Sequence, residues 1–129
     1  MTTPLHHLEQ ATKDNDLFRK VLSTSPHLQL VLMTLQPNEE IGEEVHVDND
    51  QFLRFEMGTG KVTLNGEEYP VTDGDAIIIP AGAKHNVINL SHSEPLKLYT
   101  LYGPPHHAEG TIHATKKEAD AAEEQEHHG

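Results

Sequence analysis

The sequence predicts an all-β fold, a sandwich or barrel of antiparallel strands, from three observations. Short segments rich in apolar and β-branched residues recur along most of the chain. Gly, Pro, Asn and Ser residues separate these segments at fairly regular intervals. Almost no stretch has the apolar period of an amphipathic helix. Many short strands joined by tight turns are typical of sandwiches and barrels.

The composition indicates one acidic domain. The chain has 129 residues, and 9 Lys and Arg against 21 Asp and Glu give a net charge of −12. This charge repels phosphate backbones and anionic membrane surfaces, so neither nucleic acid nor a membrane is an expected partner. The absence of Cys excludes disulfides, thiolate metal sites and cysteine nucleophiles. Because the chain has neither an apolar run of about 20 residues nor a signal-peptide pattern at its start, we expect a cytoplasmic protein.

The first part of the chain predicts an arm followed by two strands. Residues 1–16 are polar and form the expected N-terminal arm, with a short helix from Leu5 to about Lys13. Phe18 to Ser23 is the first expected strand. His27 to Gln36 is apolar at both parities. That pattern suits a strand buried on both faces, or one with a face in the core and the other in a subunit contact.

The middle of the chain predicts the remaining strands. Glu43 to Val47 is one of them, and a polar loop follows it. In Gln51 to Met57, the side chains alternate between an inward set that begins with Gln51 and an outward set that includes Phe52 and Arg54. Asn65-Gly66 is the strongest short hairpin signal in the chain. The other expected strands are Lys61 to Asn65, Glu67 to Val71, Asp75 to Ile79, His85 to Leu90 and Leu96 to Tyr102.

The barrel is expected to span residues 17–107, and the chain beyond it changes character. Residues 108–129 form an acidic tail rich in Ala, Glu and Lys, which predicts either disorder or a helix near Lys116 to Glu126. Short His tracts can bind metal, but surface solvation is the favoured interpretation for them here. These tracts are His106-His107 and His127-His128.

Two sets of residues at fixed spacing carry the chemistry of the sequence. The first set is Asn38, Glu44, His46, Gln51 and Gly58; the second set is Gly74, Pro80, Gly82, His85 and Asn89. Gly74 suits a turn with positive φ, and Pro80 with Gly82 suits a hairpin that presents His85 on the next strand. On a strand Glu44 and His46 leave the same face. A carboxylate and an imidazole on one face are the beginning of a metal site.

With these intervals, the segment from about Phe18 to His107 resembles the small single-domain bacterial cupins. The second set matches the family's motif at every defining position. The first matches in spacing, but Asn38 replaces a Gly, Glu44 a His, and Gln51 a Glu. The resemblance implies a double-stranded β-helix, or jelly-roll barrel, with a metal at its mouth. Carried over position by position, it implies the metal ligands Glu44, His46, Gln51 and His85.

This ligand set predicts one divalent transition metal per chain, with Fe or Mn favoured over Zn, Ni, Co or Cu. Two His and one carboxylate are the ligands of non-haem Fe(II) sites that keep coordination positions open. Gln51 is the weakest donor of the set, and the alternative is that it binds a metal-bound water or the substrate. Glu44 follows an acidic run that is often just a solvated edge, and Asp48 is the substitute candidate because it has the same parity.

Three functions are consistent with the sequence, because the fold alone does not decide function. The first is a Lewis-acid enzyme, an isomerase or lyase, on a small polar or carboxylate-bearing metabolite. The second is a dioxygenase that uses Fe(II) and O₂. The third is a non-catalytic module that binds a sugar or another metabolite. The expected inner wall of the barrel has no evident cluster of Arg and Lys, which argues mildly against a phosphorylated substrate. The nearest basic residues are Arg54 and Lys84. The expected substrate pocket consists of Leu53, Phe55, Val62, Asn89, Tyr99 and Tyr102.

The outward apolar residues predict a homodimer. The segment from His27 to Gln36 is apolar on both faces, and Phe52 lies on the outward face of its strand. A small barrel alone would expose this surface. Small cupins of this appearance are commonly dimers. The alternative cover for the surface is the N-terminal arm.

Overall fold

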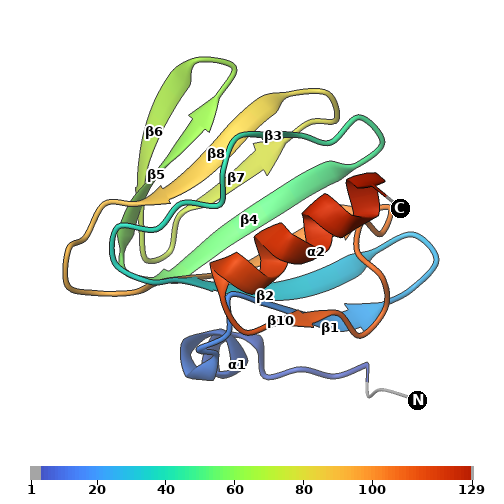
Figure 1. Cartoon of the computed structure of the whole chain (residues 1–129). Coiled ribbons are helices and arrows are strands. Elements are labelled where there is room, and N and C mark those ends of the chain that lie inside the picture. The colour runs from blue at the N-terminus through green and yellow to red at the C-terminus, as the bar shows by residue number, and fades with distance from the viewer. Residues whose placement is uncertain (1–3, 129) are drawn as a thin grey trace.

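Two antiparallel sheets packed face to face form the protein, in a computed structural model that describes residues 4–128, with side chains described through residue 124 (Figure 1). One sheet has six strands in the order β10-β1-β2-β9-β4-β7, and the other has four in the order β3-β8-β5-β6. The all-β jelly-roll prediction is confirmed. The elements are α1 (Leu8–Asp14), β1 (Arg19–Thr24), β2 (Gln29–Leu35), β3 (Glu44–Val45), β4 (Asp50–Met57), β5 (Thr59–Leu64), β6 (Glu67–Thr72), β7 (Ala76–Ile79), β8 (Lys84–Asn89), β9 (Leu96–Gly103), β10 (Ile112–His113) and α2 (Lys116–His128).

The core lies between the sheets. Along most of β4 and β9 its side chains alternate with less buried ones, because successive side chains of a strand point to opposite faces. β2 is buried on both of its faces. β9 pairs with β2 on one side and β4 on the other, so these three strands form the centre of the six-stranded sheet. The buried apolar residues of the three strands include Val31, Met33, Leu35, Leu53, Phe55, Leu96 and Leu98.

The turns have the backbone conformations that their residues favour. Asn65 (φ 49°) and Gly66 (φ 87°) form the hairpin between β5 and β6. Gly74 and Gly82 also have positive φ, as predicted for turns at these positions. The Gly82 amide donates a hydrogen bond to the carbonyl of His46, 2.9 Å away. The turn before β8 therefore anchors the loop after β3.

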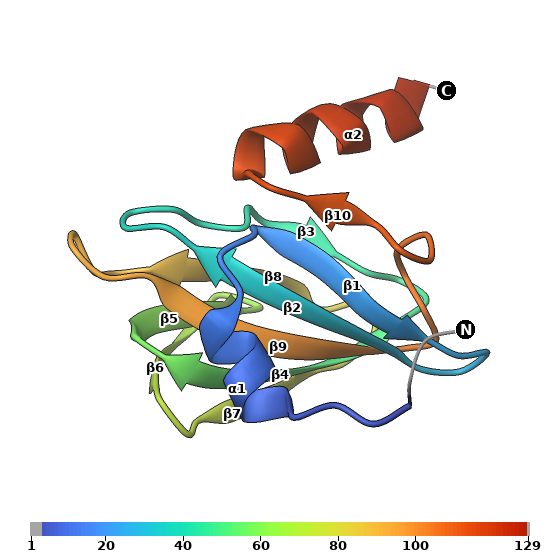
Figure 2. The same ribbon diagram turned by 90° about the horizontal axis from the view of Figure 1, so that it is seen from below.

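The helix of the N-terminal arm, α1, packs on the outer face of the six-stranded sheet (Figure 2). It contacts β2, β4 and β9, and Thr12 is fully buried there. The Lys97 ammonium donates a hydrogen bond to the Lys13 carbonyl at 2.6 Å and forms an ion pair with Asp16 at 3.0 Å. The arm is therefore part of the cover over the outward face of β2, where Leu32 is 2% exposed. This strand is buried on both faces within one chain.

The C-terminal segment, for which the sequence allowed either disorder or a helix, is joined to the barrel. β10 pairs with β1 and places His113 opposite Arg19. The Gln29 amide oxygen accepts hydrogen bonds from the backbone amides of His106 and His107, at 3.1 and 2.9 Å. Ala119 of α2 is 3% exposed. The segment contains the helix α2, at the place where the sequence allowed either a helix or disorder, and the strand β10, which is too short to be recognised from its sequence. In the part of the chain that the structure describes, no helix is long and apolar enough to cross a membrane.

Candidate metal centre

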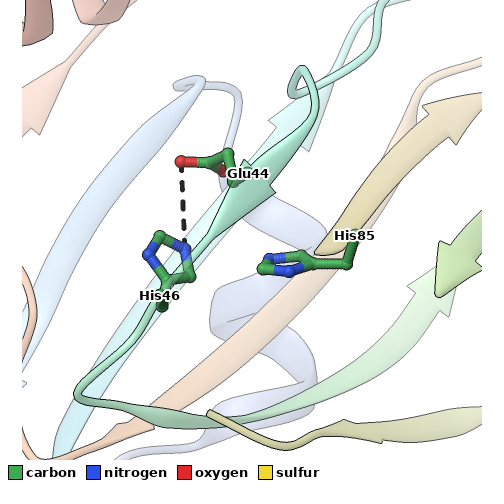
Figure 3. Close-up of side chains that lie close together, drawn as sticks. All are labelled: Glu44, His46 and His85. Carbon is green, nitrogen blue, oxygen red and sulfur yellow. Dashed lines mark ion pairs between the residues drawn. The ribbon is translucent and has the colours of Figure 1, made fainter. Parts of the chain in front are cut away.

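Three side chains converge where β3 meets β8 (Figure 3). Glu44 lies on β3, His85 is its direct partner on β8, and His46 follows β3 by one residue. One ligand atom from each of the three lies within 4.8 Å of those of the other two. The Glu44 Oε2 atom is 3.8 Å from His46 Nε2. Of the two carboxylates weighed from the sequence, Glu44 belongs to this cluster, whereas Asp48 is exposed and outside it.

Both imidazoles are in a state that suits a metal. The His85 Nδ1 atom is 3.0 Å from the Ala83 carbonyl, and because a carbonyl only accepts, Nδ1 carries the proton and Nε2 has a free lone pair. The Nε2 atom of His46 is buried and has no hydrogen-bond partner. Burial lowers the pKa of His46 to about 4 and also lowers the pKa of His85. Both rings are therefore neutral near pH 7 and can donate a lone pair.

Gln51 presents an acceptor atom that also lacks a partner. Its side chain is 5% exposed, and its amide nitrogen donates to the Thr100 hydroxyl at 2.9 Å. That bond leaves the amide oxygen, Oε1, buried and without a hydrogen bond. An unsatisfied buried acceptor has a substantial free-energy cost. A metal ion or a metal-bound water would satisfy it, so the residue fits both alternatives weighed from the sequence.

Glu44 is a carboxylate in an environment that disfavours its charge. Its side chain is 21% exposed, and burial raises its pKa to about 7 although the Arg19 guanidinium acts in the opposite direction. A cation at the centre of the cluster would stabilise the ionised form. The residues present, two neutral imidazoles, one carboxylate and one amide oxygen, fit a divalent metal ion.

Only one of the six residues predicted for the substrate pocket lies beside the cluster. Tyr102 lines the narrow space that Glu44, Gln51 and His85 also line, and its ring is 5.8 Å from that of His46. The apolar residues Leu53, Phe55 and Val62 are fully buried in the core and do not line this space.

Asn89 and Tyr99 have other positions than predicted. The Asn89 amide donates to the carbonyls of Leu35, Gln36 and Glu94, at 2.9 to 3.1 Å, so it fastens loops at the end of β8. Tyr99 lies on the outer face with Phe52, at a ring distance of 6.4 Å. Because Tyr99 and Tyr102 are three residues apart on β9, one face of the strand cannot present both.

Sequence reasoning missed three residues near the cluster. Arg19 lines the same narrow space as Glu44 and Tyr102. The His106 ring is 4.2 Å from that of His46, and the Nε2 atom of His107 is buried. Simple surface solvation is therefore wrong for His107, whereas His106 is exposed and contacts His46 through its ring. The other tract, at residues 127 and 128, lies outside the described side chains. No local pattern pointed to these residues, because each is brought in from a segment distant in sequence.

The fold and this cluster agree with the comparison to known families. The profile of the Cupin domain family matches residues 31–102, which is more than half of the chain. The chain belongs to the cupin family. The match includes every candidate metal ligand of this cupin, while Arg19, His106 and His107 lie outside it.

The relatives of this cupin support the same assignment. It is 46% identical over 124 residues to the uncharacterized protein YrkC of Bacillus subtilis (strain 168), which covers 92% of this chain and 66% of YrkC. The crystal structure of BH2720 from Bacillus halodurans matches with a TM-score of 0.89 and 45% identity, over 92% of this chain and 95% of that one. Quercetin 2,3-dioxygenase of Bacillus subtilis (strain 168) is 31% identical over 90 residues, or 70% of this chain and 27% of that enzyme. The chain thus spans just under two thirds of YrkC.

Proposed function

We propose that this cupin is a mononuclear metal-dependent enzyme that acts on a small polar metabolite, with Fe(II) or Mn(II) as the metal. The observation that carries the proposal is the convergence of Glu44, His46 and His85 within 4.8 Å. The unpartnered Nε2 of His46 and Oε1 of Gln51 support it, because both are buried lone-pair donors that need a partner.

Dioxygenase-like chemistry is the reaction class that we favour. Such a metal, when bound, supplies open positions at which O₂ and a substrate can meet. Glu44 contributes the single negative charge of the ligand set, and the two imidazoles add none. Gln51, held by its bond to Thr100, presents an oxygen in a fixed direction. Tyr102 lines the same space and is itself 3% exposed. The relationship to quercetin 2,3-dioxygenase supports this choice.

Lewis-acid chemistry by an isomerase or lyase is the second candidate, and the same ligand set supports it, because Mn(II) can polarise a substrate oxygen without redox change. Oxygen uptake separates the two classes. A binding module without catalysis is the third, and it would bind metal and metabolite without turnover.

We also propose that the protein is a homodimer. The N-terminal arm covers part of the outer face of the six-stranded sheet at β2, but the same face near β7 remains apolar and exposed. Ile78 is 66% exposed there, and Phe52 and Tyr69 line the same open groove of about 650 Å³. β7 is also an edge of its sheet, with unpaired backbone groups along one side. A second copy of the chain would cover both features.

The test of the enzyme proposal begins with metal content, measured by mass spectrometry on untagged protein purified anaerobically. The double variant His46→Ala, His85→Ala removes both imidazoles, and the matched control His27→Ala, His92→Ala removes two exposed ones. We expect near-stoichiometric Fe or Mn in the parent and the control, and none in the first variant. Oxygen uptake with candidate metabolites follows. Absence of metal from the parent, with none taken up on titration, would refute the proposal.

A further inference from the structure

A second cavity adjoins the metal centre. It has a volume of about 250 Å³ and lies between the barrel and α2. Arg19 and Glu44 line both this chamber and the narrow space at the metal centre, so the two residues form a common wall. The rest of the chamber lining comes from the segment after β9, from β10 and from α2: His106, His107, Ala108, Thr111, His113, Ala119 and Glu123.

Arg19 is the unusual member of this lining. It is 7% exposed, and its Nη1 atom lies 3.2 Å from Nδ1 of His113. Its Nε atom is buried and has no hydrogen-bond partner. Among the residues that the structure describes, no carboxylate forms an ion pair with it. The other arginine of the chain, Arg54, also has a buried Nε without a hydrogen bond, but its side chain is 41% exposed and this Nε forms an ion pair with Glu56 at 3.2 Å.

A buried guanidinium without an anion is energetically unfavourable, because removal of a charge from water is compensated only by pairing and hydrogen bonds. Glu44 lies in the same wall and is near enough for Arg19 to act on its pKa, but the two side chains form no ion pair, and a metal at the centre would take up the charge of Glu44. The planar guanidinium presents several donors in a geometry that matches a carboxylate. The partner that Arg19 lacks is therefore an anion that enters the chamber.

We propose that Arg19 binds a carboxylate of the substrate, whose other end lies at the metal centre. This proposal rests on the proposed function, and it identifies the substrate class as a small mono- or dicarboxylate. The volume of the chamber limits the size of the substrate. At roughly 30 Å³ per water molecule, about 250 Å³ corresponds to about eight waters. A metabolite of fewer than about ten non-hydrogen atoms fits such a volume, whereas a flavonoid-sized molecule does not. Larger substrates would require α2 to move.

Nuclear magnetic resonance on the parent protein tests the proposal without a variant at Arg19. The chain has two arginines, so two Nε–H signals are expected, and Arg54→Met assigns them. We use malonate as the probe and its neutral diamide, malonamide, as the control, both with metal-free protein and with protein to which Zn has been added. Malonate is expected to shift the Arg19 signal in a saturable way and to leave the Arg54 signal in place. An Arg19 signal that does not move at saturating malonate overturns the proposal.

Titration calorimetry on matched variants provides the second arm. Arg19→Met should weaken malonate binding at least about tenfold, while Arg54→Met, which removes an exposed guanidinium, should not change it. Metal stoichiometry is measured on each variant. An Arg19→Met variant that binds malonate as the parent does would mean that malonate contacts the metal alone, and the proposal fails. If the parent binds malonate through Arg19 but takes up no metal, the proposed function fails and the carboxylate site stands.

Discussion

The pH dependence of metal binding should follow one residue, Glu44. A ligand must lose its proton before it can bind a metal, so the apparent affinity falls below the pKa of the ligand. Burial raises the pKa of Glu44 to about 7, whereas that of His46 is lowered to about 4. His46 is therefore already deprotonated across the neutral range, and burial also lowers the pKa of His85 below its usual value. Glu44 is the one ligand of the three whose pKa is raised into this range, so it should dominate the pH dependence there.

The magnitude follows from a single titration with a pKa of about 7. Relative to the metal affinity with Glu44 fully ionised, the apparent affinity is lower by a factor of about 1.1 at pH 8, about 2 at pH 7 and about 11 at pH 6. The assay is Mn(II) titration calorimetry at these three pH values, in two buffers of different ionisation enthalpy that report the number of protons released. We expect approximately one proton per metal at pH 6 and close to none at pH 8.

A matched substitution isolates the effect. Glu44→Gln keeps the size of the side chain and removes the titration, so any remaining affinity should not vary between pH 6 and pH 8. The reasoning is refuted if the variant keeps the tenfold pH dependence, or if the parent releases two protons per metal at pH 6. Either result would assign the titration to another ligand.

The same carboxylate makes a prediction for the stability of the metal-free protein. Folding raises the pKa of Glu44 from 4.5 to about 7, so the folded state holds a proton that the unfolded state has released. The stabilising contribution is present in full below pH 4.5 and is lost as the pH rises through 7. The difference between the two pKa values sets an upper bound of roughly 3 kcal/mol on this contribution to the free energy of unfolding. Metal-free Glu44→Gln should therefore be more stable than the parent at pH 8 by up to that amount. Urea unfolding of both measures this, and a less stable variant would contradict it.

Three further predictions concern other parts of the molecule. Gln51→Leu, which keeps the volume but removes the amide oxygen, should weaken Mn(II) binding about tenfold by calorimetry, and an unchanged affinity would mean that Gln51 contacts neither metal nor its water. Truncation after His107 removes β10 and α2, so we expect a lower thermal midpoint by several degrees; an unchanged midpoint and metal content would show that the segment adds no stability. Ile78→Lys places a charge on the apolar groove and should convert a dimer to a monomer in analytical ultracentrifugation, whereas a parent that sediments as a monomer contradicts the dimer proposal.

Much of the fold was predictable because its determinants are local. The alternation of inward and outward side chains along β4 depends only on neighbouring residues. The turns at Asn65-Gly66 and Gly74 depend on which residues tolerate positive φ. Strand limits from the sequence differ from those of the structure by one or two residues at most elements, and only the two-residue strand β10 was missed.

The candidate ligands were predictable for a related reason. Glu44 and His46 share a face because of the local periodicity of a strand. The spacing of the two motifs, through the resemblance to cupins, predicted that His85 lies near both. The different faces of Tyr99 and Tyr102 also follow from the sequence, because three residues separate them along one strand. The position of Asn89 does not follow in this way, since its hydrogen bonds reach loops more than 50 residues away in sequence.

The sequence by itself determined the strands, the turns and a two-His, one-carboxylate set, all of which depend on short-range geometry and recurrent spacing. Only the tertiary structure decided what surrounds that set. Arg19 and His113 are 94 residues apart and meet because β10 adds to the edge of the sheet beside β1. His106 reaches His46 because Gln29 holds the backbone after β9. No local pattern encodes such pairings, since they form only when distant segments pack together, and the chamber beside the metal centre consists of them.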